Sequence, residues 1–218
     1  MRVFLQQSVL RHLGAIAVAG GIGLASPGAS LLEIPTELVV EVVEETEEPG
    51  WQNEDRQRLL ALVAEDQRVV VRARVAEVAG ALGHETPDEA EGLLARLAGD
   101  ASPRVRRSVS RGLESLLAHT DPMFRAGLVA RWSTAEDASL REAIARSLGT
   151  RTPTLVTDMA LSELCRDPEP RVRRAAVGAL APHYEEAPEE YARVAMRLVD
   201  DPDGLTRRIA RRLVSRHA

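Results

Sequence analysis

The sequence predicts an all-α protein built as a helical-repeat solenoid. An aspartate, an arginine six residues later and an apolar helical stripe return together about every 34 residues. A fixed period of this length is typical of a solenoid, in which each unit packs only on its neighbours. Aromatic residues make up only 3% of the 218 residues, so the core must consist of Leu, Val, Ile and Ala on closely packed helices. This composition favours helices over sheets.

The repeated aspartates and arginines keep one spacing at four places: Asp66 with Arg72, Asp100 with Arg106, Asp167 with Arg173, and Asp201 with Arg207. A fifth pair, Asp137 and Arg141, fits the pattern imperfectly, because its two residues lie only four positions apart. The turn before that helix is therefore expected to be shorter or shifted. Around Arg173 the apolar stripe consists of Val172, Ala175, Ala176, Ala179 and Leu180. Its spacing of i, i+3, i+4, i+7 and i+8 predicts one buried helix face.

From residue 53 onward the chain is predicted to form five helix pairs, each an A helix followed by a B helix. The A helices are expected at about 53–64, 87–98, 121–133, 153–165 and 188–199, and the B helices at about 67–82, 103–118, 137–148, 170–181 and 204–216. A capping side chain precedes a proline at Thr86-Pro87, Ser102-Pro103, Asp121-Pro122, Thr152-Pro153, Asp167-Pro168 and Asp201-Pro202. Gly83 and Gly149 are placed to end B helices.

Residues 1–50 differ from the repeats and are predicted to precede a solenoid of residues 51–218. An apolar run over 13–25 follows Arg2 and Arg11, in the proportions of a secretory signal. Three interpretations stay open for residues 1–30: a packed or partner-binding helix that seals the solenoid, a cleaved signal peptide, or a segment that contacts a membrane. Residues 31–49 hold seven glutamates and no basic residue, and we expect them to form a helix, although their valines also suit a strand.

The motif Asp-Pro-x-Pro-x-Val-Arg-Arg-Ala-Ala-x-x-Ala-Leu at 167–180, echoed at 100–113 and 201–214, resembles the HEAT repeat in its shorter bacterial form. The resemblance covers about residues 53–216 and implies a curved α-solenoid. It also implies a structural ladder, in which the repeated aspartates and arginines join neighbouring turns. Such an aspartate accepts backbone N–H groups at a helix start, while an arginine offers planar donors to carboxylates and carbonyls. The fold serves many functions and does not by itself name a partner.

Further arginines fall into two columns when the B helices are aligned: Arg107, Arg174 and Arg208, then Arg111, Arg146 and Arg212. B helices usually line the concave face of HEAT-like solenoids, so the resemblance implies a basic groove. The five B segments together carry a charge of about +6, although the net charge of the whole chain is −5. The negative net charge therefore does not exclude a polyanionic partner. The alternative is a solvated arginine face, partly neutralised by pairs such as Glu142 with Arg146.

Catalytic and metal-binding motifs are absent from the sequence, which predicts no cofactor. Cys165 is expected to be a small buried hydrophobe, and a single cysteine excludes an internal disulfide. Two enzymatic relatives are weighed as alternatives: a HEAT-like DNA glycosylase, in which Trp132 and Asp137 would face a base, and a HEAT-like bilin lyase.

The sequence therefore favours a non-enzymatic, cytoplasmic scaffold that binds another protein, one that is acidic in part, through the arginine groove. A nucleic-acid backbone is the alternative ligand, disfavoured by the few aromatic residues and the absence of lysine. Export is the alternative location, if residues 1–30 are a signal peptide. The acidic segment is expected to occupy the groove in the free protein, since several tethered glutamates act at high effective concentration.

Overall fold

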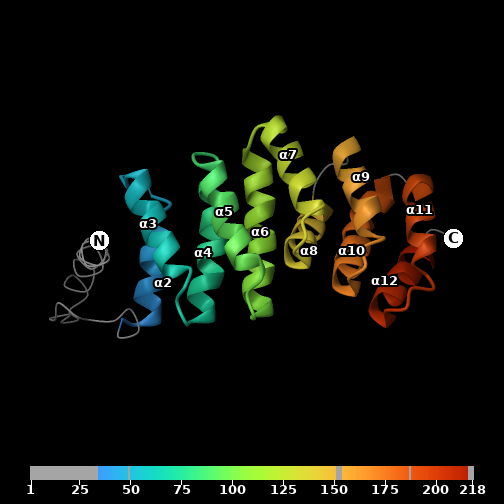
Figure 1. The fold of residues 1–218 in the computed structure, drawn as a ribbon, viewed down its shortest axis with the longest axis horizontal. Coiled ribbons are helices and arrows are strands. Elements are labelled where there is room, and N and C mark those ends of the chain that lie inside the picture. The colour runs from blue at the N-terminus through green and yellow to red at the C-terminus, as the bar shows by residue number, and fades with distance from the viewer. Residues whose placement is uncertain (1–33, 49, 151–153, 187, 216–218) are drawn as a thin grey trace. The chain divides into compact units, whose positions relative to one another are not determined.

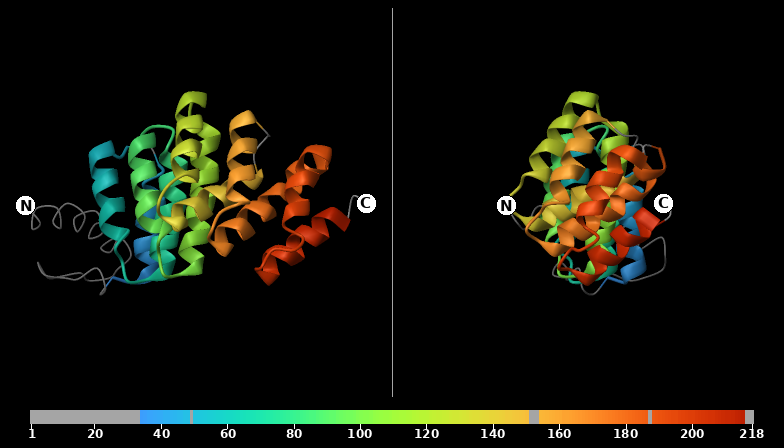
Figure 2. Two further views of the ribbon diagram at one scale, coloured as in Figure 1. Left: turned by 45° about the vertical axis from the view of Figure 1, so that its right-hand side comes forward. Right: turned by 90° about the vertical axis from the view of Figure 1, so that its right-hand side faces the viewer.

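The computed structural model describes residues 34–48, 50–150, 154–186 and 188–215. Across these ranges the chain is helical, with short loops and no strand (Figures 1 and 2). The interpretations of residues 1–30 lie outside the described residues. No described helix is long and apolar enough to cross a membrane.

Five helix pairs are present, as the sequence predicts. The A helices are α3 (Asn53–Val63), α5 (Pro87–Ala98), α7 (Pro122–Ser133), α9 (Leu155–Leu164) and α11 (Pro188–Arg197). The B helices are α4 (Val69–Leu82), α6 (Pro103–His119), α8 (Ala138–Ser147), α10 (Pro170–Glu186) and α12 (Gly204–Ser215). Helix α2 (Thr36–Glu45) precedes the first pair, and the short 3-10 helix η2 (Leu148–Thr150) follows α8.

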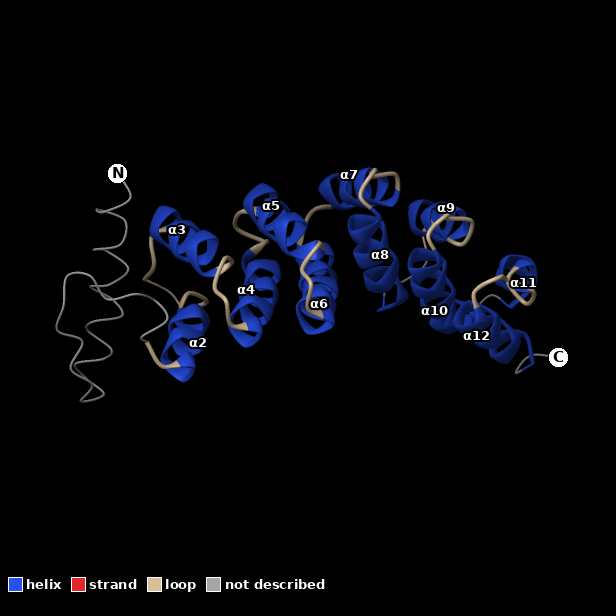
Figure 3. Cartoon of the chain, turned by 60° about the horizontal axis from the view of Figure 1, so that its bottom comes forward, coloured by secondary structure: helices blue, strands red, loops and turns tan. Residues whose placement is uncertain are grey.

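The chain divides into two compact units, residues 1–112 and 113–218, and the boundary falls within α6. In the first unit, α3 and α5 form one layer while α2 and α4 lie in the other (Figure 3). Helix α2 packs along α4 and buries Val39, Val42 and Val43. The described part of the acidic segment is therefore a helix, as expected, because its valines recur on one face.

Helices α4 and α6 approach each other closely through two glycines. A Cβ atom on Gly80 would lie 2.1 Å from the carbonyl oxygen of Gly112, and a Cβ on Gly112 would lie 2.3 Å from that of Ala76. Real Cβ atoms do not come this near to a backbone oxygen. Only residues without a Cβ allow the two backbones to meet at this point.

In the second unit, α7, α9 and α11 form one layer and α8, α10 and α12 form the other (Figure 3). Helix α10 is central, packing against α8, α9, α11 and α12. Its predicted stripe is buried as expected, at Val172, Ala175, Ala176, Ala179 and Leu180.

Helix α10 continues five residues past its predicted end at residue 181, through Pro182. The reason is the residue that follows the proline. His183 is almost fully buried, and its Nε2 donates a hydrogen bond to the carbonyl of Leu148 over 2.9 Å. Its ring also packs on the ring of Tyr191, with the centroids 5.8 Å apart. These tertiary contacts hold the helix together where sequence alone indicates a stop.

The repeat aspartates and arginines join successive turns. Arg72 donates from Nε and Nη2 to the carboxylate of Asp100, over 2.6 and 3.1 Å, and from Nη1 to the carbonyl of Asp66 over 2.6 Å. Asp100 in turn accepts the backbone N–H of Ser102. Burial alone would raise the pKa of Asp100, but the hydrogen bonds from Arg72 and Ser102 outweigh it and lower that pKa.

The third repeat corrects one expectation. The turn before α8 is neither shorter nor shifted, because Arg141 Nη1 donates to the carbonyls of Ala135 and Glu136, six and five residues earlier. Arg173 reaches carbonyls at the same two offsets. Ala135 therefore occupies the position of the repeat aspartate. Asp137 lies two residues later and caps α8 by accepting the backbone N–H of Ser139.

Helix starts follow the predicted prolines in three cases, Pro87, Pro103 and Pro122. Asp121 caps α7 by accepting two backbone N–H groups, whereas the Thr86 side chain makes no capping hydrogen bond. Helix α9 begins later than expected because Thr154 and Thr157 form a capping box. Gly83 follows α4 as predicted, and Gly149 lies within η2.

Candidate binding surface

The six column arginines are divided between the two units. Arg107 and Arg111 lie on α6 in the first unit, while Arg146, Arg174, Arg208 and Arg212 lie on α8, α10 and α12 in the second. Two of the six, Arg146 and Arg174, line a common pocket. We call this hollow, formed by α8, η2, α10 and α12, the arginine pocket.

The arginine pocket has a volume of about 410 Å³. Its two arginines are joined by an apolar lining that includes Ala175, Pro182 and Ile209. Gly178 also lines it, and a Cβ built on this residue meets no atom within 4 Å. The pocket can therefore accept an apolar side chain and a carboxylate of another protein at the same time.

Both pocket arginines already have acidic neighbours. Arg146 donates to Glu142 over 2.6 Å, the pair considered from the sequence, and Arg174 donates to Asp203 over 3.0 Å. Asp203 also accepts the hydroxyl and backbone N–H of Thr206, which helps to start α12. Hydrogen bonds from Thr206 and then from Arg174 lower the pKa of Asp203 well below its usual range. A ligand must thus compete with carboxylates for these two arginines.

The first unit shows the same kind of neutralisation. Arg111 Nη1 donates to Glu77 over 2.5 Å, and the hydroxyl of Ser108 donates to the same carboxylate. Three of the six arginines, Arg111, Arg146 and Arg174, are therefore paired with carboxylates. Arg107, Arg208 and Arg212 are exposed, and the described part of the chain offers them no ion pair.

Sequence reasoning missed Glu77 and Asp203, although both leave a signal. Glu77 lies one repeat period before Arg111 and occupies the same column, so alignment alone predicts that the two side chains meet across neighbouring B helices. Asp203 lies 29 residues after Arg174 and directly before α12, where an aspartate is a favoured cap.

The acidic segment does not contact the column arginines within the described residues. Glu44 and Glu47 of the α2 region instead lie 3.0 Å from Arg74 on α4. The apolar face of α2 is buried on α4 at the same time. The structure thus makes this segment a packed element of the first unit, which differs from the expected occupant of the groove.

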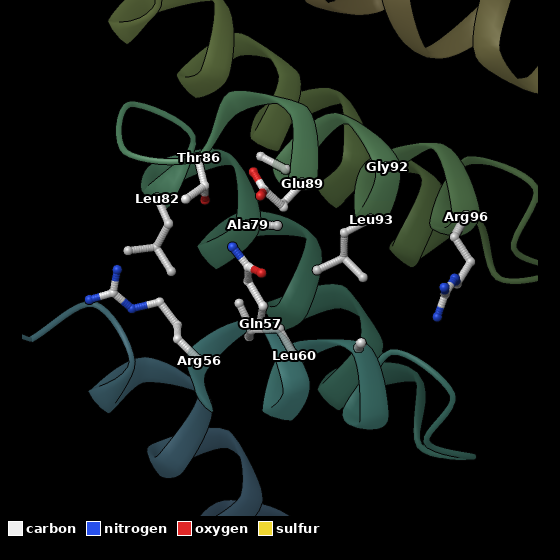
Figure 4. A pocket seen from close by; sticks show the side chains of 12 residues that line it. Arg56, Gln57, Leu60, Ala79, Leu82, Thr86, Glu89, Gly92, Leu93 and Arg96 are labelled. Carbon is white, nitrogen blue, oxygen red and sulfur yellow. The ribbon is translucent and has the colours of Figure 1, made fainter. Parts of the chain in front are cut away.

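A second pocket, of about 300 Å³, lies between α3, α4 and α5 (Figure 4). Leu60, Leu82 and Leu93 give it an apolar lining, and Arg56 and Arg96 stand at opposite ends of it in this view. Arg56 is buried and uses Nη1 for hydrogen bonds to Asn53 and Glu85. None of the column arginines lines this pocket.

The residues considered for catalysis are not arranged for it. Trp132 is buried, with 3% of its surface exposed, and cannot stack on a base as the glycosylase alternative requires. Burial raises the pKa of the Cys165 thiol to about 12, which makes it a poor nucleophile. No group of three metal-ligating side chains occurs among the described residues.

Comparisons with known proteins agree with this architecture. A family model described as HEAT repeats matches residues 56–149 and 125–215. The MAST/Orbit N-terminal domain has a similar structure, with a TM-score of 0.57 and 15% identity, covering 87% of this chain and 93% of that one. A structure of crescerin, described as using a TOG domain array to regulate microtubules in the primary cilium, has a TM-score of 0.55 at 16% identity, covering 86% of this chain and 87% of that one.

A third structure, described for microtubule plus end tracking by XMAP215, CLIP-170 and EB1, also has a TM-score of 0.55 at 16% identity. It covers 86% of this chain and 86% of its own. No curated protein matches the sequence. At these identities the structural likeness concerns the fold alone.

Proposed function

Because this chain belongs to the HEAT-repeat family, we propose that it is a non-enzymatic scaffold that binds another protein through the arginine pocket. One observation carries the proposal: Arg146 and Arg174 line the same pocket together with apolar residues. HEAT-repeat folds commonly mediate protein interactions, so a site on the B helices suits the architecture. A cytoplasmic location, expected from the single cysteine, is part of the proposal.

The chemistry of the pocket favours an acidic protein segment over nucleic acid. Apolar groups such as Ile209 and Pro182 favour an apolar side chain of the partner, while the arginines favour a carboxylate beside it. Stacking on bases would need exposed aromatic rings, and Trp132 is buried. Microtubules appear in the descriptions of two of the similar structures. At 16% identity, however, the likeness supports the fold alone. We therefore define the partner of this chain by its chemistry.

The test is to fill the pocket without disturbing the helix. Gly178→Leu places a side chain where a Cβ meets open space, and replacing a helical glycine by leucine should leave the fold intact or stabilise it. The wild-type chain and this variant would be used to capture proteins from the native host after nuclease treatment. We expect at least one protein to be retained by the wild type and lost, by about tenfold or more, with Gly178→Leu.

Gly92→Leu is the matched control, because Gly92 also has open space around its Cβ but lines the other pocket. It should retain the same protein as the wild type. Equal capture by all three chains would contradict the proposal. Capture that disappears on nuclease treatment would instead support the nucleic-acid alternative, with phosphate contacts to the arginines.

A further inference from the structure

The exposed side of α9 carries large apolar side chains beside the exposed Glu163, although the inner face of this helix is already buried. Ala160, Leu161 and Leu164 pack inward, whereas Leu155 is 76% and Met159 is 62% exposed. Large apolar side chains are unusual on the exposed side of a surface helix, where charged and polar residues normally stand. The equivalent α3 and α5 follow the ordinary pattern, since charged residues, including Glu54 and Arg58 on α3 and Glu89 and Arg96 on α5, take their exposed positions.

A recess lies beside this face, between α9 and α11. It has a volume of about 310 Å³, and Leu155, Met159 and Val194 line it together with Leu180 of α10. Leu155 and Met159, which lie one turn apart on α9, therefore line a hollow and are not isolated exposed side chains. Large apolar surface of this kind marks sites where another molecule docks. We call these four residues and the arginines described next the α9 recess.

The charge around the α9 recess is predominantly positive. Arg166, Arg193 and Arg197 line it, and Asp158 is the acidic lining residue. Arg166 donates to Glu163 over 2.5 Å, so Arg193 and Arg197 supply the positive charge that is left. The carboxylate of Asp158 already accepts the hydroxyl of Tyr191 over 2.5 Å. Arg193 and Arg197 stand one turn apart on α11, and neither has an ion pair among the described residues. An occupant with carboxylates on both sides of an apolar stripe would complement this arrangement.

We propose that the α9 recess binds an acidic amphipathic helix of a partner protein. Apolar side chains of that helix, spaced i and i+4, enter the recess between Leu155, Met159 and Val194, and its carboxylates pair with Arg193 and Arg197. The hollow shape favours a helix over an anionic membrane, because a recess accepts side chains whereas a bilayer requires projecting ones. The α9 recess shares no lining residue with the arginine pocket.

The direct test is binding of a fluorescein-labelled synthetic peptide by fluorescence anisotropy, using the full chain. The peptide has about 16 residues, long enough for a helix, with leucines on one face and glutamates elsewhere. Met159→Glu should weaken its binding about tenfold or more, because a carboxylate then meets the apolar stripe. The double variant Arg193→Glu, Arg197→Glu should weaken it as well, and high salt should reduce the affinity of the wild type.

Matched controls exist on this chain. Met123→Glu alters a methionine that is 83% exposed on α7 and does not line the recess, so it should bind like the wild type. Gly178→Leu should also leave peptide binding unchanged, which separates this proposal from the function proposed above. Circular dichroism of each variant verifies that the helical fold is retained.

Several results would overturn the proposal. One is equal binding of the peptide by the wild type and Met159→Glu; another is equally tight binding of a peptide with lysines in place of the glutamates. Anionic phospholipid vesicles that bind through Met159 while the peptide does not would make the face a membrane contact. A dimer that Met159→Glu dissociates, without peptide binding, would assign the face to a second copy of the chain.

Discussion

Arg173 and Asp201 form a two-point ion pair between successive repeats. Arg173 Nε and Nη2 donate to the two carboxylate oxygens of Asp201 over 2.7 and 3.0 Å. The remaining guanidinium nitrogen, Nη1, donates to the carbonyls of Asp167 and Pro168 in the turn of its own repeat. One side chain thus fixes its own turn and the next one, and both ionic groups are largely withdrawn from solvent.

Removing the arginine should therefore be costly. Arg173→Ala leaves the buried carboxylate of Asp201 without its partner, and we expect a loss of about 3–5 kcal/mol in the free energy of unfolding. Urea unfolding followed by circular dichroism measures this loss. Arg211→Ala is the control, since Arg211 pairs with Asp200 at the exposed surface, where such pairs contribute about 0–1 kcal/mol. Similar losses in the free energy of unfolding for the two variants would show that the buried pair stabilises the fold no more than the exposed pair does.

Acid should unfold the protein through the same carboxylates. Hydrogen bonds from Arg173 lower the pKa of Asp201, although burial and Asp203 partly oppose them, and the pKa of Asp66 and Asp100 is lowered as well. A pKa that is lower in the folded state contributes stability above the unfolded value, about 3.9 for aspartate, and that stability is lost as the pH falls toward the folded pKa.

We therefore expect these aspartates to contribute a nearly constant stability above about pH 5 and a falling one below about pH 4. Urea titrations at a series of pH values give the free energy of unfolding directly. The decline should be smaller in Arg173→Ala, because the pKa of Asp201 is then closer to its unfolded value. An acid dependence identical to that of the wild type would argue against the role of this pair.

The glycines of α4 and α5 should respond in opposite directions to alanine. In Gly80→Ala the new Cβ would meet the Gly112 carbonyl at 2.1 Å, so the backbones must separate, at a cost of about 1–3 kcal/mol or more. Gly92→Ala adds a Cβ in open space and should gain up to about 1 kcal/mol from helix propensity. Thermal unfolding of both variants compares them, and stabilisation by Gly80→Ala would show that α4 and α6 do not meet this closely.

Cys165 should react slowly while the chain is folded. Because burial raises the pKa of its thiol to about 12, very little thiolate is present near pH 8. Alkylation by iodoacetamide, followed by mass spectrometry, should be slow in buffer and rapid after unfolding in urea. Comparable rates in the two conditions would mean that the thiol is accessible in the native protein.

Periodicity was sufficient to predict the helix pairs, because the same apolar and capping pattern recurs in each repeat. It misplaced details where tertiary contacts decide the outcome. The burial of His183 extends α10 through Pro182, and Arg141 keeps its carbonyl contacts although Ala135 has replaced the repeat aspartate. A proline or a missing aspartate is a local signal, whereas these contacts depend on the neighbouring helices.

The candidate sites were less accessible to sequence reasoning. Aligning the B helices located Arg146 and Arg174, but the pocket that joins them depends on how α8, α10 and α12 pack. Two of the carboxylates that pair with the arginines come from other repeats: Glu77 pairs with Arg111, and Asp203 pairs with Arg174. Leu155 and Met159 of α9 were present in the sequence, yet that both side chains are exposed is a finding of the structure.

The guanidinium contacts between repeats also bear on how such a chain can change its length. Arg72, Arg141 and Arg173 each donate from Nε and Nη2 to the aspartate of the following turn and from Nη1 to a carbonyl of their own turn, so these joints are chemically interchangeable. A gene segment duplicated from one such aspartate to the next would bring both halves of a compatible joint with it. The array can therefore be lengthened without evolving a new interface, while the side chains outside the joints diverge toward different partners.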